Sequence, residues 1–297
     1  MNRLSQHIFR IALLALAFSA FLARSALAAE YYDQYGLSPA SAELNLGIQP
    51  HGYPSGVISA VMSRDRIMLN ALAQLSSPLK THPFQRGADM LSLLADQRLE
   101  AGLIGDVPTI LAAARGDVWI VGLVKQTSTS IVAKNETRVS NLAGKRIAFV
   151  ENSSAHNTLL QGLKAAGLTE SDVKLVNMRV DEMPDALEAG KIDAFAAWEP
   201  APTNALSRSN KNHTVFRGLS SDYFVINRNF EKRSPEAARI LVAGFVRAIE
   251  WMRRSQKNAE MAARWAIADA EKFSSKKSSL PASQIVAITR RELLTVP

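Results

Sequence analysis

Short apolar runs alternate with helical stretches along most of this chain, and that alternation limits its fold more than any other feature. Runs typical of strands occupy residues 44–48, 79–84, 101–104, 118–124, 130–133, 146–150, 173–178 and 194–197. Stretches with helical spacing lie between them at 57–75, 89–99, 108–114, 155–166 and 183–189. Repeated strand–helix units of this kind predict an α/β fold.

The last third of the chain departs from this alternation. Two short strand-like runs at 214–217 and 223–226 precede helical patterns at 235–254, 258–270 and 283–294. The two short strands are placed to return the chain to its first half, which favours two α/β lobes. Periodicity alone leaves one continuous doubly wound domain as an alternative.

Residues 1–28 have the pattern of a cleaved secretory signal. Arg3 and Arg10 supply positive charge, residues 11–22 are apolar except for Ser19, and residues 25–28 form a cleavage site before Ala29. The apolar run is shorter than the roughly 20 residues of a membrane-spanning helix. The sequence therefore predicts a periplasmic protein that is not inserted in the membrane once the signal is removed. A retained signal anchor is the alternative.

The absence of cysteine excludes several kinds of chemistry. A lipid anchor on cysteine, a disulfide and a thiol nucleophile are all impossible. Removal of the signal takes away three arginines and no acid, so the net charge falls from +8 to +5. The remaining basic residues are scattered, which is typical of solvated helix faces and does not favour nucleic-acid binding. We expect a monomer.

Three segments share one local design, a strand followed by a polar loop and a helix start. They are residues 85–89, which include Gly87 and Ala88, residues 105–108, with Asp106 and Pro108, and residues 152–156, with Ser153 and Ser154. Helix starts have unpaired backbone N–H groups and partial positive charge, so several of them together make an anion site. Ordinary helix capping explains each segment taken alone.

Candidate functional side chains outside these three designs are few, and the main ones are Trp198 and Glu199. Trp198 and Glu199 follow a strand directly, so Trp198 either stacks on a ligand or belongs to the core. His156 stands near two serines at a helix start, but that spacing does not form a nucleophile and its base. The five histidines show no metal-binding spacing, and the sequence has no P-loop, no GxSxG and no dinucleotide fingerprint. We expect no catalytic site, no metal and no cofactor.

Several of these segments carry a family resemblance when taken in order. They are residues 105–108 (GDVP) with 121–122, then 142–148 (LAGKRIA), 153–157 (SSAHN), 165–168 (AAGL), 172–173 (DV), 186–194 (ALEAGKIDA) and 198–200 (WEP). Together they resemble the periplasmic binding proteins of nitrate, taurine and alkanesulfonate ABC importers.

The resemblance implies a two-lobed periplasmic-binding-protein fold of the type II kind, with hinge strands between the lobes. Residues 29–126 and 218–297 would form lobe one, and residues 127–217 would form lobe two. The implied ligand contacts are Gln49, Tyr53, Gly87, Ala88, Gly105 and Asp106 from lobe one, and Ser153, Ser154, His156, Trp198 and Glu199 from lobe two. Hydroxyls and backbone N–H groups would hold an oxyanion, while Trp198 and Tyr53 would cover its organic part.

The function implied is that of the solute-binding component of an ABC importer, with the permease as partner and a small anionic or zwitterionic solute as ligand. The acids Asp106, Glu151 and Glu199 are expected to pair with Arg64 or Arg86, or to bind an amine or hydroxyl of the ligand. The second option favours a zwitterion such as taurine over nitrate. An enzyme on the same scaffold, related to thiamine-pyrimidine synthesis, and a sensory binding module are the alternatives.

Overall fold

The computed structural model describes residues 32–39 and 41–293, so the signal expected at 1–28 lies outside the described residues. The chain divides into two units, residues 1–38 and residues 39–297. In the described part of the first unit, the backbone N–H of Tyr35 donates to the carbonyl of Tyr32 at 3.1 Å.

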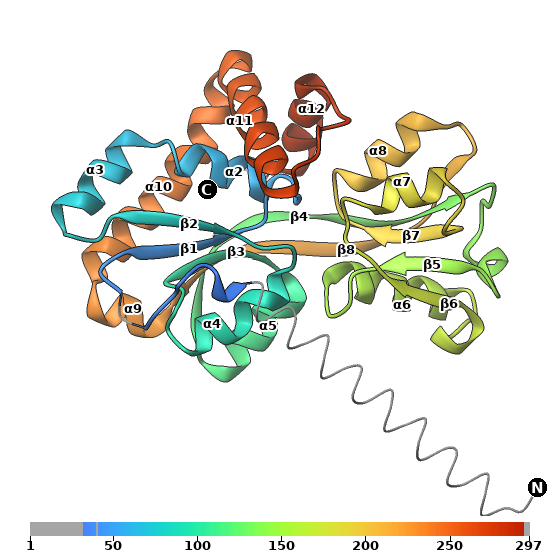
Figure 1. Cartoon of the computed structure of the whole chain (residues 1–297), viewed down its shortest axis with the longest axis horizontal. Helices are drawn as coiled ribbons and strands as arrows, with labels where there is room; N and C mark the ends of the chain where they lie inside the picture. Colours follow the sequence, from blue (N-terminus) through green and yellow to red (C-terminus); the bar gives the residue numbers. More distant parts are fainter. Residues whose placement is uncertain (1–31, 40, 294–297) are drawn as a thin grey trace, which may run out of the picture. The chain divides into compact units, whose positions relative to one another are not determined.

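The second unit is built on one eight-stranded sheet within its described residues, in the order β2-β1-β3-β8-β4-β7-β5-β6 (Figure 1). The strands are β1 (Leu44–Ile48), β2 (Leu79–Pro83), β3 (Ala101–Gly105), β4 (Val118–Lys134), β5 (Arg146–Phe149), β6 (Lys174–Asn177), β7 (Ala194–Ala197) and β8 (Asn212–Asn227). β1, β2 and β3 are mutually parallel, as are β5, β6 and β7.

Two long strands join these parallel groups. β4 and β8 have 17 and 16 residues and pair antiparallel from Val118↔Asn227 to Lys134↔Asn212. One end of β8 pairs with β3, and the far end of β4 pairs with β7. The four short strands expected at 118–124, 130–133, 214–217 and 223–226 are therefore two continuous strands. The polar residues that interrupt each apolar pattern are held in the ladder by backbone hydrogen bonds, which do not depend on side-chain polarity.

Helices cover both faces of the sheet (Figure 1). They are α2 (Ser55–Met62), α3 (Arg66–Gln74), α4 (Leu91–Ala95), α5 (Asp106–Arg115), α6 (Ser154–Ala165), α7 (Met183–Glu188), α8 (Ala201–Arg208), α9 (Arg228–Arg233), α10 (Pro235–Arg254), α11 (Gln256–Ser274) and α12 (Ala282–Glu292). Short 3-10 helices occur at η1 (Gly87–Met90), η2 (Val139–Leu142) and η3 (Glu170–Asp172).

The helix expected at 57–75 is two helices. Asp65 interrupts it, because its carboxylate accepts hydrogen bonds from the backbone N–H groups of Ile67 and Met68 and so starts α3. The helix expected at 89–99 is also shorter, since η1 occupies its first turn and α4 ends at Ala95.

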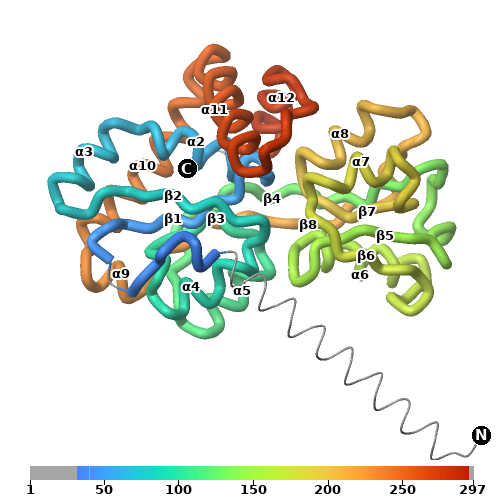
Figure 2. Tube along the Cα trace, viewed as in Figure 1, coloured from blue at the N-terminus to red at the C-terminus, as the bar shows by residue number. Residues whose placement is uncertain are grey.

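Separate cores support the two parallel groups. We call the part built on β1, β2 and β3 the first lobe, and the part built on β5, β6 and β7 the second lobe. In the first lobe, α2, α10, α11 and α12 pack on one face around Leu46, Ile58 and Leu241. In the second lobe, α6 covers one face around Leu159 and α7 covers the other around Leu187. Figure 2 shows the C-terminal α11 beside α2, to which it packs although they are far apart in sequence.

No helix in the described part of the chain has the length and apolar character needed to cross a membrane.

Candidate functional site

A small cavity lies where the two lobes meet, at the carboxyl ends of several strands, and we call it the central pocket. Its cavity volume is about 30 Å³, and all the space between its lining atoms, open solvent at the mouth included, amounts to about 450 Å³. Seven of the residues expected from the sequence line it: Gln49, Gly87, Ala88, Gly105, Ser153, Ser154 and Trp198. The structure therefore brings together residues from five separate segments of the chain.

Helix starts face this pocket from both lobes. α2 begins at Ser55, and α6 begins at Ser154; both residues line the pocket. α5 begins at Asp106, directly after the lining residue Gly105. The N-cap residues of α2 and α5 make no side-chain cap. In α2 the N–H of Gly56 donates to the carbonyl of Gly52 and that of Val57 to the carbonyl of Pro54, so the positive end of the helix dipole is what these starts offer an anion. In α6 the cap is Ser153, whose hydroxyl accepts from the N–H of His156 at 3.3 Å and donates to the carbonyl of Val150 at 2.6 Å.

Asp106 joins the lobes beside the pocket. Its Oδ1 accepts a hydrogen bond of 2.5 Å from Ser154 Oγ in the second lobe and one of 2.8 Å from the backbone N–H of Val107. Its Oδ2 accepts from the backbone N–H of Ser221 at 3.1 Å. Asp106 and Ser154 are thus in direct contact, as an anion site built from converging helix starts requires.

The sequence did not point to Asp222, which also lines the pocket from β8. Ser55 Oγ donates to its Oδ2 at 2.6 Å, and Nζ of Lys125 lies 4.0 Å from its Oδ1. Lys125 and Asp222 are cross-strand partners in the β4–β8 ladder, and the Lys125 side chain is only 1% exposed. A buried lysine is stable when an acid lies close to it. The sequence signal for Asp222 was a polar stretch at 220–222 that faces another at 125–130. This signal becomes visible only once the two strands are paired.

Four expected residues do not line the central pocket, namely Asp106, described above, and Tyr53, His156 and Glu199. Tyr53 is 3% exposed and faces a different cavity, and burial raises the pKa of its phenol above the ordinary range. The carboxylate of Glu199 pairs with Arg291 at 2.8 Å. The ring of His156 packs on Phe149 with centroids 4.6 Å apart.

The acids of this region are held by partners other than those expected. Arg64 pairs with Asp269, and Arg86 pairs with Asp89. The ion pair expected between Glu199 and one of these arginines is wrong, because Arg291 of α12 lies against Glu199 instead. Asp106 is satisfied by a hydroxyl and two backbone N–H groups. Residues 32–39 and 41–293 contain no cluster of acidic, histidine or cysteine side chains able to hold a metal ion.

Known proteins share parts of this amino-acid sequence. The NMT1-like family matches residues 76–268, more than half of the chain. The chain belongs to the NMT1-like family. Its curated relatives include a putative aliphatic sulfonates-binding protein of Escherichia coli K12, 32% identical over 161 residues that make up 52% of this chain and 50% of that protein. The taurine-binding periplasmic protein of the same organism is 28% identical over 166 residues, 52% of either chain. This NMT1-like chain spans about half the length of the curated relatives it matches.

Solved structures extend the likeness of the NMT1-like chain to most of its length. The periplasmic aliphatic sulphonate binding protein SsuA of Escherichia coli is 25% identical, with a TM-score of 0.64, and the match covers 85% of this chain and 84% of that one. The nitrate-binding protein NrtA of Synechocystis PCC 6803 shares the fold at 15% identity and a TM-score of 0.61, over 84% of this chain and 70% of that one. The expected two-lobed periplasmic-binding-protein fold is confirmed, and these relatives are named as binding proteins, not as enzymes.

Proposed function

We propose that this protein is the solute-binding component of an ABC importer and that the central pocket captures a small organic sulfonate or a related zwitterion. The observation that carries the proposal is the meeting of the starts of α5 and α6, one from each lobe, where Ser154 Oγ donates to Asp106. Sulfonate-binding and taurine-binding proteins among the relatives support the same ligand class.

The ligand contacts we propose are the seven expected residues that line the pocket, from Gln49 to Trp198. The positive dipole ends of α2, α5 and α6, which begin at or beside the pocket, suit the oxygens of a sulfonate. The indole of Trp198 suits the carbon chain that carries it. Asp106 is assigned a positioning role, since it holds Ser154 and does not line the pocket.

The charge of Asp222 favours a ligand that also carries an amine. A carboxylate about 4 Å from a bound anion costs about 4 kcal/mol at an effective dielectric constant near 20. Lys125 and Ser55 reduce that cost, because both contact the Asp222 carboxylate. An ammonium group on the ligand turns the remaining repulsion into attraction, which favours an aminosulfonate such as taurine over nitrate.

Binding is expected to involve closure of the lobes about β4 and β8. We propose residues 29–126 and 218–297 as lobe one and residues 127–217 as lobe two, so that the hinge lies where the two long strands pass between the lobes. Contacts made by one ligand to both lobes favour the closed state. We further propose that residues 1–28 are removed on export, that the protein works in the periplasm as a monomer, and that the closed form docks on a permease.

Calorimetric titration of the purified protein tests this proposal. Taurine is expected to bind more tightly than ethanesulfonate, which has the same length and no amine, and ethanesulfonate more tightly than nitrate. Ser154→Ala should weaken all three, whereas Ser207→Ala on the exposed end of α8 should leave them unchanged. Heat from nitrate alone would contradict the ligand class. N-terminal sequencing of exported protein should begin at Ala29.

A further inference from the structure

A second and larger cavity lies on the other side of the loop that precedes α2, and we call it the side cavity. Gln49 and Gly52 of this loop line the central pocket, whereas His51 and Tyr53 line the side cavity. Two hydrogen bonds between the lobes separate the central pocket from the side cavity. Trp198 Nε1 donates to the carbonyl of His51 at 3.3 Å, and the N–H of Tyr53 donates to the carbonyl of Glu199 at 3.0 Å. The side cavity is therefore a compartment of its own.

The side cavity has an apolar interior supplied by both lobes. Its apolar lining includes Tyr53, Leu280 and Ile285 from the first lobe and Val180, Pro184 and Ala201 from the second. The cavity volume is about 360 Å³, which lies in the size range of sites that hold small organic molecules. An apolar group placed there is removed from water on several sides.

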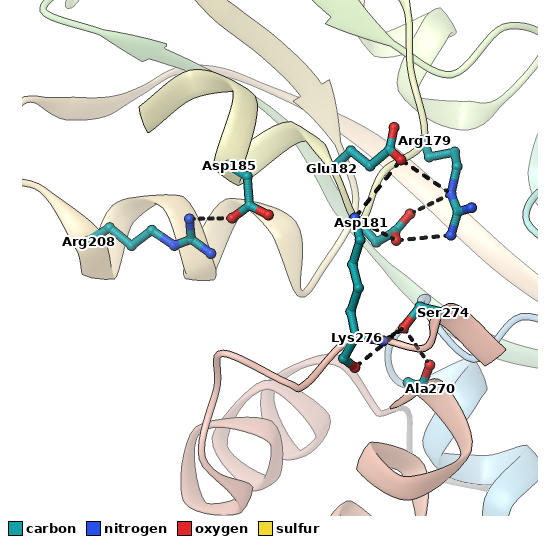
Figure 3. Close-up of polar contacts among 8 residues, drawn as sticks. All are labelled: Arg179, Asp181, Glu182, Asp185, Arg208, Ala270, Ser274 and Lys276. Atoms are coloured by element: carbon teal, nitrogen blue, oxygen red, sulfur yellow. Dashed lines mark hydrogen bonds and ion pairs between the residues drawn. The ribbon is translucent and has the colours of Figure 1, made fainter. Parts of the chain in front are cut away.

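The charged side chains that line the side cavity are already paired with acids or bases of the protein. Figure 3 shows Lys276 reaching from the loop after α11 to Asp181 and Glu182, each at 3.9 Å. It also shows Arg208 bonded to Asp185, at 2.7 Å. The third lining base, Lys277, pairs with Glu271 at 3.3 Å. Three lining bases thus balance three lining acids, so an ionic ligand would have to break an existing pair. The cavity suits an uncharged group.

One polar atom of a residue that lines this cavity lacks a partner among the described residues. Nε2 of His51 is buried and has no hydrogen-bond partner among the described residues, while the ring stacks on Phe273 with centroids 5.6 Å apart. Burial lowers the pKa of His51, and the nearby charges of Arg179 and Lys276 lower it further against the opposing effect of Asp181. The ring is therefore neutral at pH 7. A hydroxyl both donates and accepts, so it satisfies Nε2 in either tautomer.

We propose that the side cavity is a second binding compartment, which takes an uncharged ring or branched apolar group bearing a hydroxyl. Such a group is either a separate small molecule or the substituent of a ligand whose anionic end occupies the central pocket. Because the first lobe supplies one wall and the second lobe the other, an occupant contacts both lobes and favours their closed arrangement. The proposal that the cavity binds a separate molecule is independent of the proposed function. The proposal that it takes a substituent of the central-pocket ligand rests on that function.

The probe for a separate molecule is phenol, with toluene as the matched compound that lacks the hydroxyl. Backbone amide shifts of Ser278 and Ser279 in ¹⁵N-labelled protein report on the side cavity, which both residues line. Phenol should shift them saturably and more strongly than toluene. Ser274→Trp fills the cavity and should weaken the affinity for phenol by at least about tenfold. Ser207→Trp is the control, because each serine lies in the last turn of its helix and donates to a carbonyl of that helix, but Ser207 does not line the cavity.

His51→Phe tests the unpaired nitrogen, since it keeps the stacked ring and removes Nε2. The preference for phenol over toluene should shrink toward one in this variant. Absence of saturable shifts at Ser278 and Ser279, or equal phenol binding in the wild type and in Ser274→Trp, would overturn the proposal.

Two sulfonate probes distinguish the sources of the group. If the cavity takes a substituent, 3-(4-hydroxyphenyl)propane-1-sulfonate should bind more tightly than methanesulfonate by at least about tenfold, and Ser274→Trp should remove that advantage. If it takes a separate molecule, phenol and methanesulfonate should bind together. Methanesulfonate is followed at the amides of Gly105 and Ser154, so a failure of the central pocket is seen independently of phenol binding.

Discussion

Gly105→Ala is the substitution that tests the central pocket most directly. A Cβ at this position would lie 2.8 Å from Ser154 Oγ, whereas ordinary contacts begin at 3.4 Å. The backbone itself accepts alanine, because Gly105 has φ −69° and ψ 170°. The protein should therefore fold normally, and Ser154 should rotate away from the new methyl group.

The cost of that rotation follows from the bond that is lost. Ser154 Oγ donates to the carboxylate of Asp106 across the lobes at 2.5 Å. A hydrogen bond to a charged group contributes about 1.5–3 kcal/mol. Since about 1.4 kcal/mol is a factor of ten, the closed state should lose about one to two orders of magnitude in population relative to the open state. Affinity for taurine should fall by a similar factor.

A double-mutant cycle with Ser154→Ala gives the measurement its control. Alanine at 154 has no Oγ to meet the new methyl group. Gly105→Ala should therefore reduce the affinity for taurine only slightly in that background, and the effects of the two substitutions should not add. Gly52→Ala is a second control in the same pocket, because its Cβ would meet nothing closer than 3.5 Å. Calorimetry measures the affinities, and thermal melting without ligand confirms folding. Unchanged affinity in folded Gly105→Ala, or fully additive effects, would refute the reasoning.

Three further predictions concern stability and closure. Burial, and secondarily the charge of Lys80, lowers the pKa of His82 from 6.5 to about 4. Between these pH values the unfolded chain binds more protons than the folded one, so the free energy of unfolding should fall as the pH drops from 6.5 to 4. Urea midpoints at pH 7 and pH 5 should differ less in His82→Gln, and an equal difference would contradict this. Gly162→Ala would place a Cβ 2.6 Å from Ile131 Cδ1 in the second-lobe core and should lower the free energy of unfolding by about 1–3 kcal/mol in urea; an unchanged midpoint would count against it. Arg291→Ala removes the 2.8 Å pair with Glu199 between the lobes and should speed taurine release by up to about fivefold at low salt and less at high salt, as stopped-flow traces would show. A salt-independent effect would exclude an ion-pair origin.

The elements of this fold were largely predictable because their signals are local. Most strands and helices begin within a few residues of where the alternating pattern places them, as at Pro235, which opens α10. Asp65 shows the limit of such patterns. Its apolar surroundings predicted one continuous helix, whereas its carboxylate caps a new one.

The candidate site was predictable only in part. Gly105, Ser153 and Ser154 were found because a helix start following a strand is visible in the sequence and such loops gather at the carboxyl ends of strands. Trp198 and Glu199 are adjacent in the chain, yet one lines the central pocket and the other pairs with Arg291, because neighbouring side chains at the end of a strand point to different sides.

The amino-acid sequence by itself determined the α/β class, the positions of most elements and the family, since each depends on residues that lie close together along the chain. The tertiary structure alone decided that β4 and β8 run continuously through both lobes, and hence that Lys125 lies beside Asp222 at the pocket. These two residues are far apart in sequence, and the register of an antiparallel pair is set by backbone hydrogen bonds along both strands, for which neither segment alone carries a signal.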